Sequence, residues 1–443
     1  MNIYALSSGR GPSGIAIVRI SGKETLKICE KITKLKSIKS NEVNFCKFYN
    51  PKNDNVIDPE ALLLWFPGPN SYTGEDLAEL QIHGSNAVIN ALFKVLSEEE
   101  NCRLAEPGEF TKLAFQNDKI DLLKAESIGD LIHSETELQR EQAVKLVRGN
   151  ASNYYNDLRE KIIKSLAYIE AKIDFAEDDL PEKVLKEAHK SIKNIHKEIL
   201  NILEDNKIGE KIRDGFRVSI TGEVNAGKSS LLNLLSKREV AIVSDEAGTT
   251  RDVIETYLNL DGYPVILSDT AGIRDVKNEV ERKGISLALG KSKESDLNIV
   301  VIDNLSKNIN NKIKKMINKD TIVLLNKSDV QNKQNHKFDV DTVFASVKNN
   351  KNIDKLINKI KEKLSKKFSS KNNSHLITRE RHRIKLNWCL KELDNFLNKD
   401  QNTDLELAAE DLRMATRHLG SIAGKVDVEE ILGSIFKDFC IGK

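Results

Sequence analysis

The chain has 443 residues, of which 39% are hydrophobic and 31% charged, a composition that excludes a disordered or fibrous protein. Its 69 basic and 67 acidic residues nearly balance, so charge alone does not indicate a nucleic-acid-binding protein. No stretch approaches 18 apolar residues, the N-terminal segment lacks a signal-peptide pattern, and the five cysteines have no metal-ligand spacing. We therefore expect a cytoplasmic protein of several domains, with no membrane contact, disulfide framework or zinc site.

The first part of the chain has the sequence pattern of short β-strands separated by turns. Short apolar runs such as GIAIVRIS and EALLLWF are separated by the turn-rich segments NPKNDN and PGPNSYTG. This pattern predicts an α+β domain over residues 1–118. Beyond it, Ile128, Leu131, Ile132 and Leu138 follow a helical spacing that Glu135 interrupts, which predicts a helical segment over residues 119–210.

An α/β domain is predicted over residues 211–367. The strand-like runs FRVSIT, YPVILSDT, LNIVVID, TIVLLN and VDTVFAS alternate there with helical segments, as in a mostly parallel sheet with crossover helices. After a polar linker, helical periodicity returns over residues 368–443, with a last helix predicted over 428–439. We expect the α/β domain to be inserted into one helical domain that is split in sequence.

GEVNAGKSS, which follows the strand-like run FRVSIT, matches the phosphate-binding pattern G-x-x-x-x-G-K-[ST]. Gly222 and Gly227 let the backbone wrap phosphates, Lys228 meets the β- and γ-phosphate charge, and the Ser229 hydroxyl ligates Mg²⁺. The helical run after the loop places it at a helix N-terminus, where anions are stabilised. This segment predicts a nucleotide site.

Two further motifs specify the nucleotide. DTAG places Asp269 at the end of a predicted strand, where its carboxylate can hold the water shell of Mg²⁺. The same motif places Gly272 where its N–H can contact the γ-phosphate. NKSD places Asp329 where its carboxylate can accept both the N1–H and the exocyclic amine of guanine, a pair of donors that adenine lacks. The three motifs in order predict a GTP-binding domain.

The segments around these motifs hold further candidates. Thr249 or Thr250 in AGTTRD supplies a switch hydroxyl to Mg²⁺, and we favour Thr250. ASVKN is the candidate base loop. Ile273 follows DTAG where small GTPases often carry a water-orienting glutamine, so we consider Glu279 and Glu281 for that task.

These motifs, together with PGPNSYTGEDLAELQIHGS, PGEFTKLAFQNDKIDLLKAESIGDLI and the terminal CIGK, closely resemble the tRNA modification GTPases of the MnmE (TrmE) family. The resemblance runs from Gly14 to Lys443. It implies an N-terminal folate-binding domain that also dimerises the protein, a helical domain and an inserted Ras-like P-loop GTPase domain.

The resemblance also implies an activity and its partners. A homodimer would hydrolyse GTP with Mg²⁺ and K⁺ and would join the flavoprotein MnmG (GidA) in a heterotetrameric or larger complex. The complex would add an aminomethyl or carboxymethylaminomethyl group to C5 of the wobble uridine of certain tRNAs. The one-carbon unit would come from a tetrahydrofolate derivative, methylene- or formyl-tetrahydrofolate.

The resemblance assigns the site residues of the family to positions of this chain, one motif at a time. The resemblance implies folate contacts at Arg19, Glu79, Lys119 and Lys443, K⁺ ligands at Asn225, Ser244, Glu246 and Thr249, and a water-orienting Glu281. It implies nucleotide contacts at Asn225, Ala226, Gly227, Lys228, Ser229, Ser230, Ser244, Asp245, Glu246, Ala247, Gly248, Thr249, Thr250, Asp269, Thr270, Ala271, Gly272, Asn326, Lys327, Ser328, Asp329, Ser346, Val347 and Lys348. Cys440 is implied at the modification centre, as a nucleophile, a proton-transfer group or a structural thiol. The base loop departs from the family pattern, because Val347 replaces a small residue.

Two other functions fit part of the sequence. A ribosome-assembly GTPase acting as an RNA-binding switch would carry an RNA-binding module after the GTPase domain, but the helical segment there has no GXXG loop. A purely regulatory GTPase would leave the PGEFT segment and the tail without a role. We therefore favour the modification enzyme.

Overall fold

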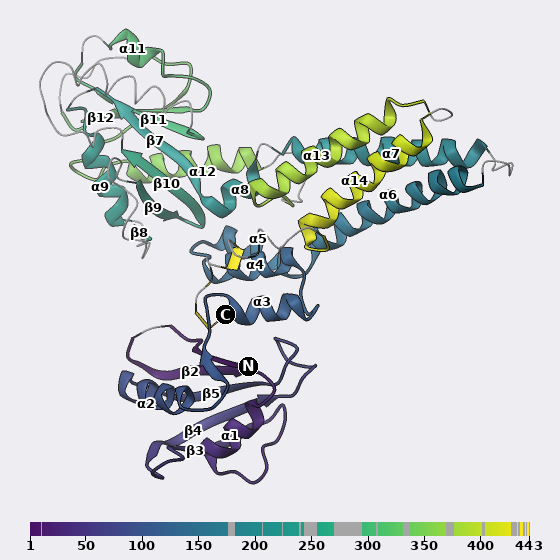
Figure 1. Ribbon diagram of the computed structural model, residues 1–443. Helices are drawn as coiled ribbons and strands as arrows, with labels where there is room; N and C mark the ends of the chain where they lie inside the picture. The colour runs from purple at the N-terminus through teal and green to yellow at the C-terminus, as the bar shows by residue number, and fades with distance from the viewer. Residues whose placement is uncertain are drawn as a thin grey trace, which may run out of the picture. The chain divides into compact units, whose positions relative to one another are not determined.

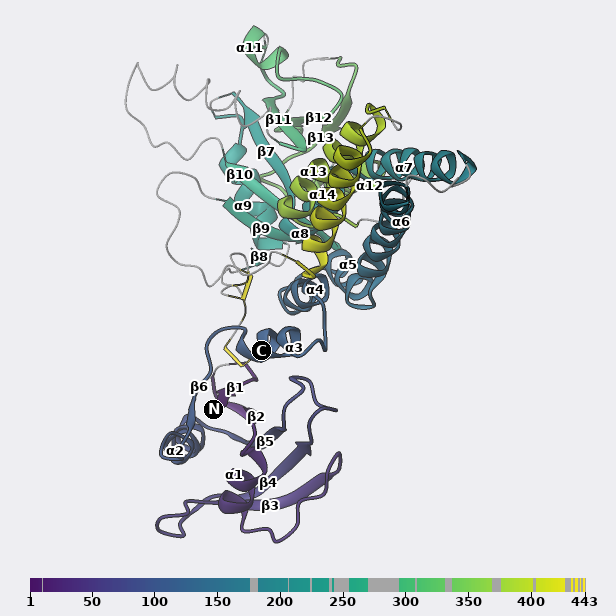
Figure 2. The ribbon, with the colours of Figure 1, turned by 45° about the vertical axis from the view of Figure 1, so that its right-hand side comes forward.

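The computed structural model describes residues 1–9, 11–175, 182–205, 207–223, 225–238, 241–242, 255–269, 295–306, 309–330, 337–368, 376–400, 404–426, 432, 435–436, 439 and 441–442. Figures 1 and 2 show the ribbon from two directions. Two compact units emerge from the contacts within the chain: Met1–Gly129 with Val147–Glu160 and Thr416–Lys443, and Asp130–Leu146 with Lys161–Ala415. Both units contain parts of the predicted split helical domain, whose boundaries stay a prediction.

A six-stranded sheet and two helices build the N-terminal part of the first unit. Its elements are β1 (Asn2–Leu6), β2 (Ser13–Ser21), α1 (Thr25–Thr33), β3 (Val43–Tyr49), β4 (Val56–Phe66), β5 (Leu77–Gly84), α2 (Asn86–Ser97) and β6 (Cys102–Leu104). The strand order is β3-β4-β5-β2-β1-β6, antiparallel except for the parallel pair β1 and β6. One face buries Val18, Leu63 and Leu80 in a core shared with Ile28 of α1 and Leu92 of α2. The predicted α+β class is confirmed here.

The C-terminal segment packs against the helices that follow this sheet, α3 (Glu109–Gln116) and α4 (Leu122–Ile132). Phe436 and Phe439 form a small core with Ala125. A Cβ on Gly108 would lie 2.7 Å from the Phe436 backbone oxygen, so glycine permits this close approach. Most of the helix predicted over 428–439 lies outside the described residues.

The remaining helices are α5 (Glu137–Val147), α6 (Asn150–Asp174), α7 (Glu182–Leu203), α8 (Ile208–Asp214), α13 (Glu380–Leu397) and α14 (Leu405–Ala423). Helix α4 ends at Ile132 and α5 begins at Glu137, so the helical structure is interrupted at Glu135, the residue that interrupts the predicted apolar stripe. Helices α7 and α13 lie side by side (Figure 1). α7 buries Ile192, Ile195 and Ile199 along one side, the three- and four-residue spacing of an amphipathic helix.

A seven-stranded sheet forms the predicted α/β domain within the second unit. Its strands are β7 (Phe216–Gly222), β8 (Ala241–Ile242), β9 (Glu255–Leu260), β10 (Tyr263–Asp269), β11 (Leu297–Asp303), β12 (Thr321–Asn326) and β13 (Asp341–Phe344), with helices α9 (Lys228–Arg238), α11 (Asn311–Lys314) and α12 (Ile353–Phe368). The order is β13-β12-β11-β7-β10-β9-β8. The first five of these are parallel, whereas β9 pairs antiparallel with both neighbours. The carboxyl ends of β7, β10, β11 and β12 therefore share one edge, where ligands bind in open α/β sheets.

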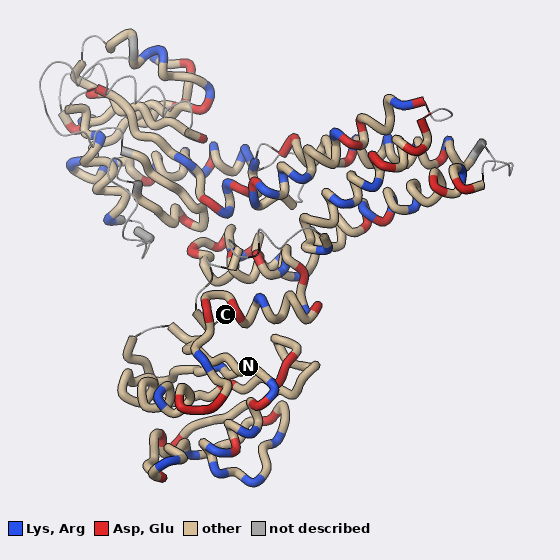
Figure 3. Tube along the Cα trace, in the orientation of Figure 1, with Lys and Arg blue, Asp and Glu red and all other residues tan. Residues whose placement is uncertain are grey.

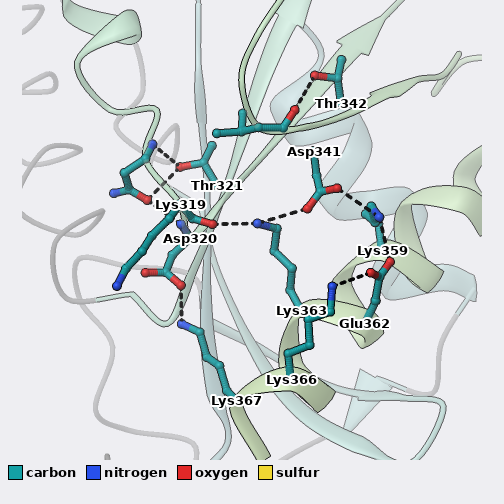
Figure 4. Close-up of polar contacts among 12 residues, drawn as sticks. Lys319, Asp320, Thr321, Asp341, Thr342, Lys359, Glu362, Lys363, Lys366 and Lys367 are labelled. Atoms are coloured by element: carbon teal, nitrogen blue, oxygen red, sulfur yellow. Dashed lines mark hydrogen bonds and ion pairs between the residues drawn. The ribbon is translucent and has the colours of Figure 1, made fainter.

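Helix α12 is held at the opposite edge by ion pairs (Figure 4). Lys359 and Lys363 bind the two carboxylate oxygens of Asp341, the first residue of β13, at 3.0 and 3.2 Å. Lys367 binds Asp320, immediately before β12, at 2.9 Å. Each of these partly exposed pairs contributes about 1 kcal/mol or less to folding. Together they fix the C-terminal half of α12 at the edge opposite the one that carries the nucleotide motifs.

Basic and acidic residues are intermixed along both units (Figure 3), as their near balance in the sequence predicts. Within the described ranges, none of the helices combines the length and the apolar character that crossing a bilayer requires.

Candidate functional site

The phosphate loop connects the end of β7 to the start of α9. Gly222 has φ +141, and a Cβ there would lie 2.0 Å from the Val301 backbone oxygen on the neighbouring strand. Gly227 has φ +101, and a Cβ there would lie 2.3 Å from Nδ2 of Asn326. Both positions require glycine for backbone conformation and for space. The loop then opens directly into α9, whose first N–H groups have no partner within the helix.

Lys228 is held inside this loop by backbone oxygens. Its Nζ donates to the carbonyl oxygens of Glu223 at 2.7 Å and Gly222 at 3.2 Å. The ammonium therefore lies where it can bind phosphate oxygens at the N-terminus of α9. Asn225, at φ +61, and Ser229, in the first turn of α9, are both exposed. Within the described part of the chain, neither of their side chains makes a hydrogen bond.

Asn326 joins the phosphate loop to the base loop. The side chain is buried at the end of β12. Its Nδ2 donates to the Ala226 backbone oxygen at 2.8 Å, and its Oδ1 accepts from the Val347 backbone N–H at 3.0 Å. One amide thus fixes the phosphate loop and the base loop relative to each other.

Two of the remaining three residues of the NKSD motif are oriented by neighbouring side chains. Lys327 forms an ion pair with Asp303 at the end of β11, with Nζ and Oδ2 2.5 Å apart. The exposed Asp329 accepts from Nδ2 of Asn349 at 3.1 Å. A hydrogen bond from the Ser346 hydroxyl lowers the pKa of Asp329. The carboxylate is therefore ionised at neutral pH, as accepting two guanine donors requires.

The base loop shows why Val347 is compatible with this site. Its side chain is buried in the core of the α/β domain, and its N–H is bonded to Asn326. Ser346 is fully buried, and its backbone pairs with that of Lys351. Ser328 donates from its backbone N–H to the Ala345 oxygen at 3.1 Å. The loop is thus built from backbone bonds that tolerate a larger apolar side chain.

Several predicted site residues lie outside the described residues: Ser244, Asp245, Glu246, Ala247, Gly248, Thr249, Thr250, Thr270, Ala271, Gly272, Glu281, Cys440 and Lys443. For Asp269 the structure describes the backbone at the end of β10. Their predicted roles stay predictions.

A second cluster lies on the face of the N-terminal sheet opposite α1 and α2. Arg19 and Glu79 stand opposite each other on β2 and β5, and Nη2 and Nε of Arg19 bind Oε1 of Glu79 at 2.6 and 3.2 Å. The guanidinium carbon lies 5.5 and 5.6 Å from the ring centroids of Tyr72 and Phe110. Burial raises the pKa of the Tyr72 hydroxyl, which is hydrogen-bonded to Thr111. The cluster combines a carboxylate, a cation and two aromatic rings.

The C-terminal tail reaches this cluster. The Gly442 backbone oxygen accepts from Oγ of Ser7 at 2.8 Å and lies 3.5 Å from Nη1 of Arg19. Ile441 forms a β-bridge with Pro107. Gly442 has φ +98, and a Cβ there would lie 2.3 Å from the Leu6 oxygen. The tail is therefore a packed element beside Arg19.

Of the three described folate candidates, the structure brings two into direct contact. Lys119 lies instead against the loop that carries Tyr72, with its Cε 3.2 Å from a Cβ built on Gly74. Tyr72, Phe110 and Ser7 were not singled out from the sequence. The first two belong to the segments PGPNSYTG and PGEFT that carry the family resemblance, but only the fold shows that their rings flank Arg19.

Comparisons with known proteins show to which family the chain belongs. Residues 2–119 match the family described as GTP-binding protein TrmE N-terminus, and residues 122–440 match the MnmE helical domain. The tRNA modification GTPase MnmE of Pelagibacter ubique (strain HTCC1062) is 56% identical over 449 residues, covering 100% of both chains. The protein of the same name from Rickettsia bellii (strain RML369-C) is 42% identical, covering 100% of this chain and 99% of that one. The chain belongs to the MnmE (TrmE) family of tRNA modification GTPases.

Proposed function

We propose that this chain is a K⁺-stimulated GTPase that acts as a homodimer with the flavoprotein MnmG (GidA). Together they would add an aminomethyl or carboxymethylaminomethyl group to C5 of the wobble uridine of certain tRNAs, using a folate one-carbon unit. GTP hydrolysis with Mg²⁺ in tRNA modification follows from the family. The potassium, the folate, the homodimer and the flavoprotein are the proposal.

Two side chains of the phosphate loop support the assignment of K⁺ and Mg²⁺ to this site. The Asn225 amide and the Ser229 hydroxyl are exposed and bind no described group, so their oxygens are available to K⁺ and Mg²⁺. A monovalent cation beside the loop supplies positive charge where negative charge develops between the β- and γ-phosphates. Lys228 adds a fixed positive charge from inside the loop. We assign orientation of the attacking water to Glu281.

The observation that carries the folate assignment is the convergence of Arg19, Glu79 and the tail. Nε and Nη2 of Arg19 bind Oε1 of Glu79, and Oε2 has no hydrogen bond among the described residues. This oxygen can accept from the ring N–H and amino group of a pteridine, while Tyr72 and Phe110 offer aromatic faces. When bound, the folate supplies the one-carbon unit. We assign Lys443 to closing this site and Cys440 to the modification centre.

Exposed apolar residues on strand β3 of the N-terminal sheet support the proposed homodimer. Val43 and Phe45 of β3 are 61% and 69% exposed, and they stand opposite Leu64 and Leu62 of β4. An exposed apolar surface of this kind is typical of a protein interface. Phe45→Glu should shift the protein from dimer to monomer in sedimentation velocity. Leu407→Glu, at a position that is 59% exposed on α14, should leave the dimer unchanged.

The folate assignment is tested with Glu79→Gln. Because charged hydrogen bonds contribute about 1.5–3 kcal/mol, binding of 5-formyl-tetrahydrofolate by calorimetry should weaken at least about tenfold. GTP hydrolysis should not change. Glu60→Gln on β4 is the exposed control. Equal folate affinity in both variants and the parent would remove Glu79 from the site.

The whole proposal is tested by mass analysis of wobble nucleosides in tRNA from cells with and without the gene. We expect the aminomethyl and carboxymethylaminomethyl uridines to disappear with the protein and to return with the parent sequence. They should not return in cells that lack the flavoprotein. An unchanged nucleoside profile would contradict the proposal.

A further inference from the structure

Helix α13 has a buried side and an exposed side. The buried positions are His382, Arg383, Leu386, Cys389, Leu393 and Phe396. The other side carries the residues that recur every three or four positions around Trp388, which we call the Trp388 stripe: Arg381, Ile384, Lys385, Trp388, Lys391, Glu392 and Asn395. Helix α7 packs along α13, and four residues of the stripe, Ile384, Trp388, Lys391 and Asn395, are exposed, so a partner can reach it.

The centre of the stripe is apolar. Trp388 is 47% exposed and Ile384, one turn earlier, is 39% exposed. Indole has a large apolar surface, and exposing it to water forfeits the free energy that burial would provide. The only other tryptophan in the chain, Trp65, has a buried indole nitrogen. Trp388 is therefore the more exposed of the two tryptophans.

Two lysines of the stripe have no carboxylate partner among the residues that the structure describes. Nζ of Lys385 lies 4.6 Å from the centroid of the Trp388 ring, and the exposed Lys391 follows Trp388 by three residues. In the described ranges, neither lysine has an ion pair. The lysines of α12 differ, since Lys359, Lys363 and Lys367 are all paired with carboxylates (Figure 4). The charges of Lys385 and Lys391 are thus available to a partner.

We propose that the Trp388 stripe is a contact surface for tRNA, with an unstacked base on the indole and backbone phosphates at Lys385 and Lys391. Aromatic rings flanked by cations are how proteins bind single-stranded nucleic acid. The cores of protein interfaces are instead depleted in lysine, which argues against a protein partner here. The inference rests on the tRNA-modification function of the family, and it gives tRNA a location on this chain.

Intrinsic fluorescence provides the test, because the chain has only two tryptophans. Titrating the full-length protein with bulk deacylated tRNA should quench Trp388 emission. The quenching should persist in Trp65→Phe and vanish in Trp388→Phe. A DNA duplex of similar length, whose bases stay stacked, should not quench it. Quenching that is the same in Trp388→Phe and the parent would overturn the proposal.

Charge variants provide a second measurement that leaves the fold intact. Lys385→Glu and Lys391→Glu should each weaken tRNA binding about tenfold and reduce the slope of log affinity against log salt by about 0.7. Lys193→Glu, at an exposed position of α7, should change neither. Unchanged tRNA affinity with lost flavoprotein binding would show a protein contact and overturn the inference. Wobble nucleosides, measured in parallel, report separately on the proposed function.

Discussion

Asn326 donates from Nδ2 to the backbone oxygen of Ala226 across 2.8 Å, which joins the end of β12 to the phosphate loop. The same amide accepts from Val347, so both of its ends are used inside a buried site. A buried group that loses its partner costs about 1–3 kcal/mol. The relative position of the phosphate loop and the base loop therefore depends on the side chain of Asn326.

Asn326→Asp should weaken GTP binding by about 2 kcal/mol, roughly thirtyfold, because a carboxylate cannot donate to Ala226. Fluorescent-nucleotide titration measures this loss. Asn233→Asp, exposed on α9, should bind GTP normally. Normal GTP affinity in Asn326→Asp would show that the amide does not set the loop geometry.

Asp329→Asn should shift nucleotide preference toward xanthosine nucleotides, since an amide offers a donor where the carboxylate only accepts. Asn349→Ala removes the group that orients this carboxylate at 3.1 Å and should weaken GTP binding severalfold without changing the preferred base. Competition between GTP and xanthosine triphosphate distinguishes the two effects. Unchanged guanine selectivity in Asp329→Asn would remove its proposed role.

The pKa of Asp329 predicts how GTP binding responds to acid. The Ser346 hydroxyl holds this pKa below its ordinary value, so the carboxylate stays ionised as the pH falls through that value. GTP affinity should therefore be constant down to about pH 5, above the usual aspartate range. In Ser346→Ala the pKa rises, and affinity should begin to fall at a higher pH than in the parent. Identical pH profiles would contradict this assignment.

Asn225→Ala should abolish stimulation of GTP hydrolysis by K⁺ while leaving GTP binding unchanged. The side chain contributes no hydrogen bond to the described part of the fold, so its removal takes away no stabilising contact, and the φ of +61 adds about 1 kcal/mol of backbone strain for alanine. Hydrolysis rates in KCl and NaCl measure the effect. Equal stimulation in the variant and the parent would refute the K⁺ assignment.

Gly442→Ala should displace the tail from Arg19, because φ is +98 and the new Cβ would lie 2.3 Å from the Leu6 oxygen. We expect tRNA modification to be lost while GTP hydrolysis continues, and we expect the same result for Cys440→Ser, since Cys440 is assigned to the modification centre. Gly9→Ala, where a Cβ meets nothing within 4 Å, should modify tRNA normally. Full modification in Gly442→Ala would show that the docked tail is not required.

The sequence by itself determined the class of fold and the nucleotide. Strand-like runs and motif order predicted a mostly parallel sheet with Lys228 and Asp329 at its edge, because local periodicity and short motifs are written in neighbouring residues. The antiparallel strand β9 was not singled out, since strand direction depends on pairing with distant residues.

Only the tertiary structure decided which residues from distant segments meet. Tyr72 and Phe110 flank Arg19, and Ser7 binds Gly442 435 positions away, contacts that no spacing in the sequence encodes. Likewise, only the structure shows that Trp388 is exposed on α13, because the sequence pattern of this helix does not distinguish Trp388 from a buried residue. Contacts and exposure follow from how whole elements pack, which is a property of the chain in three dimensions.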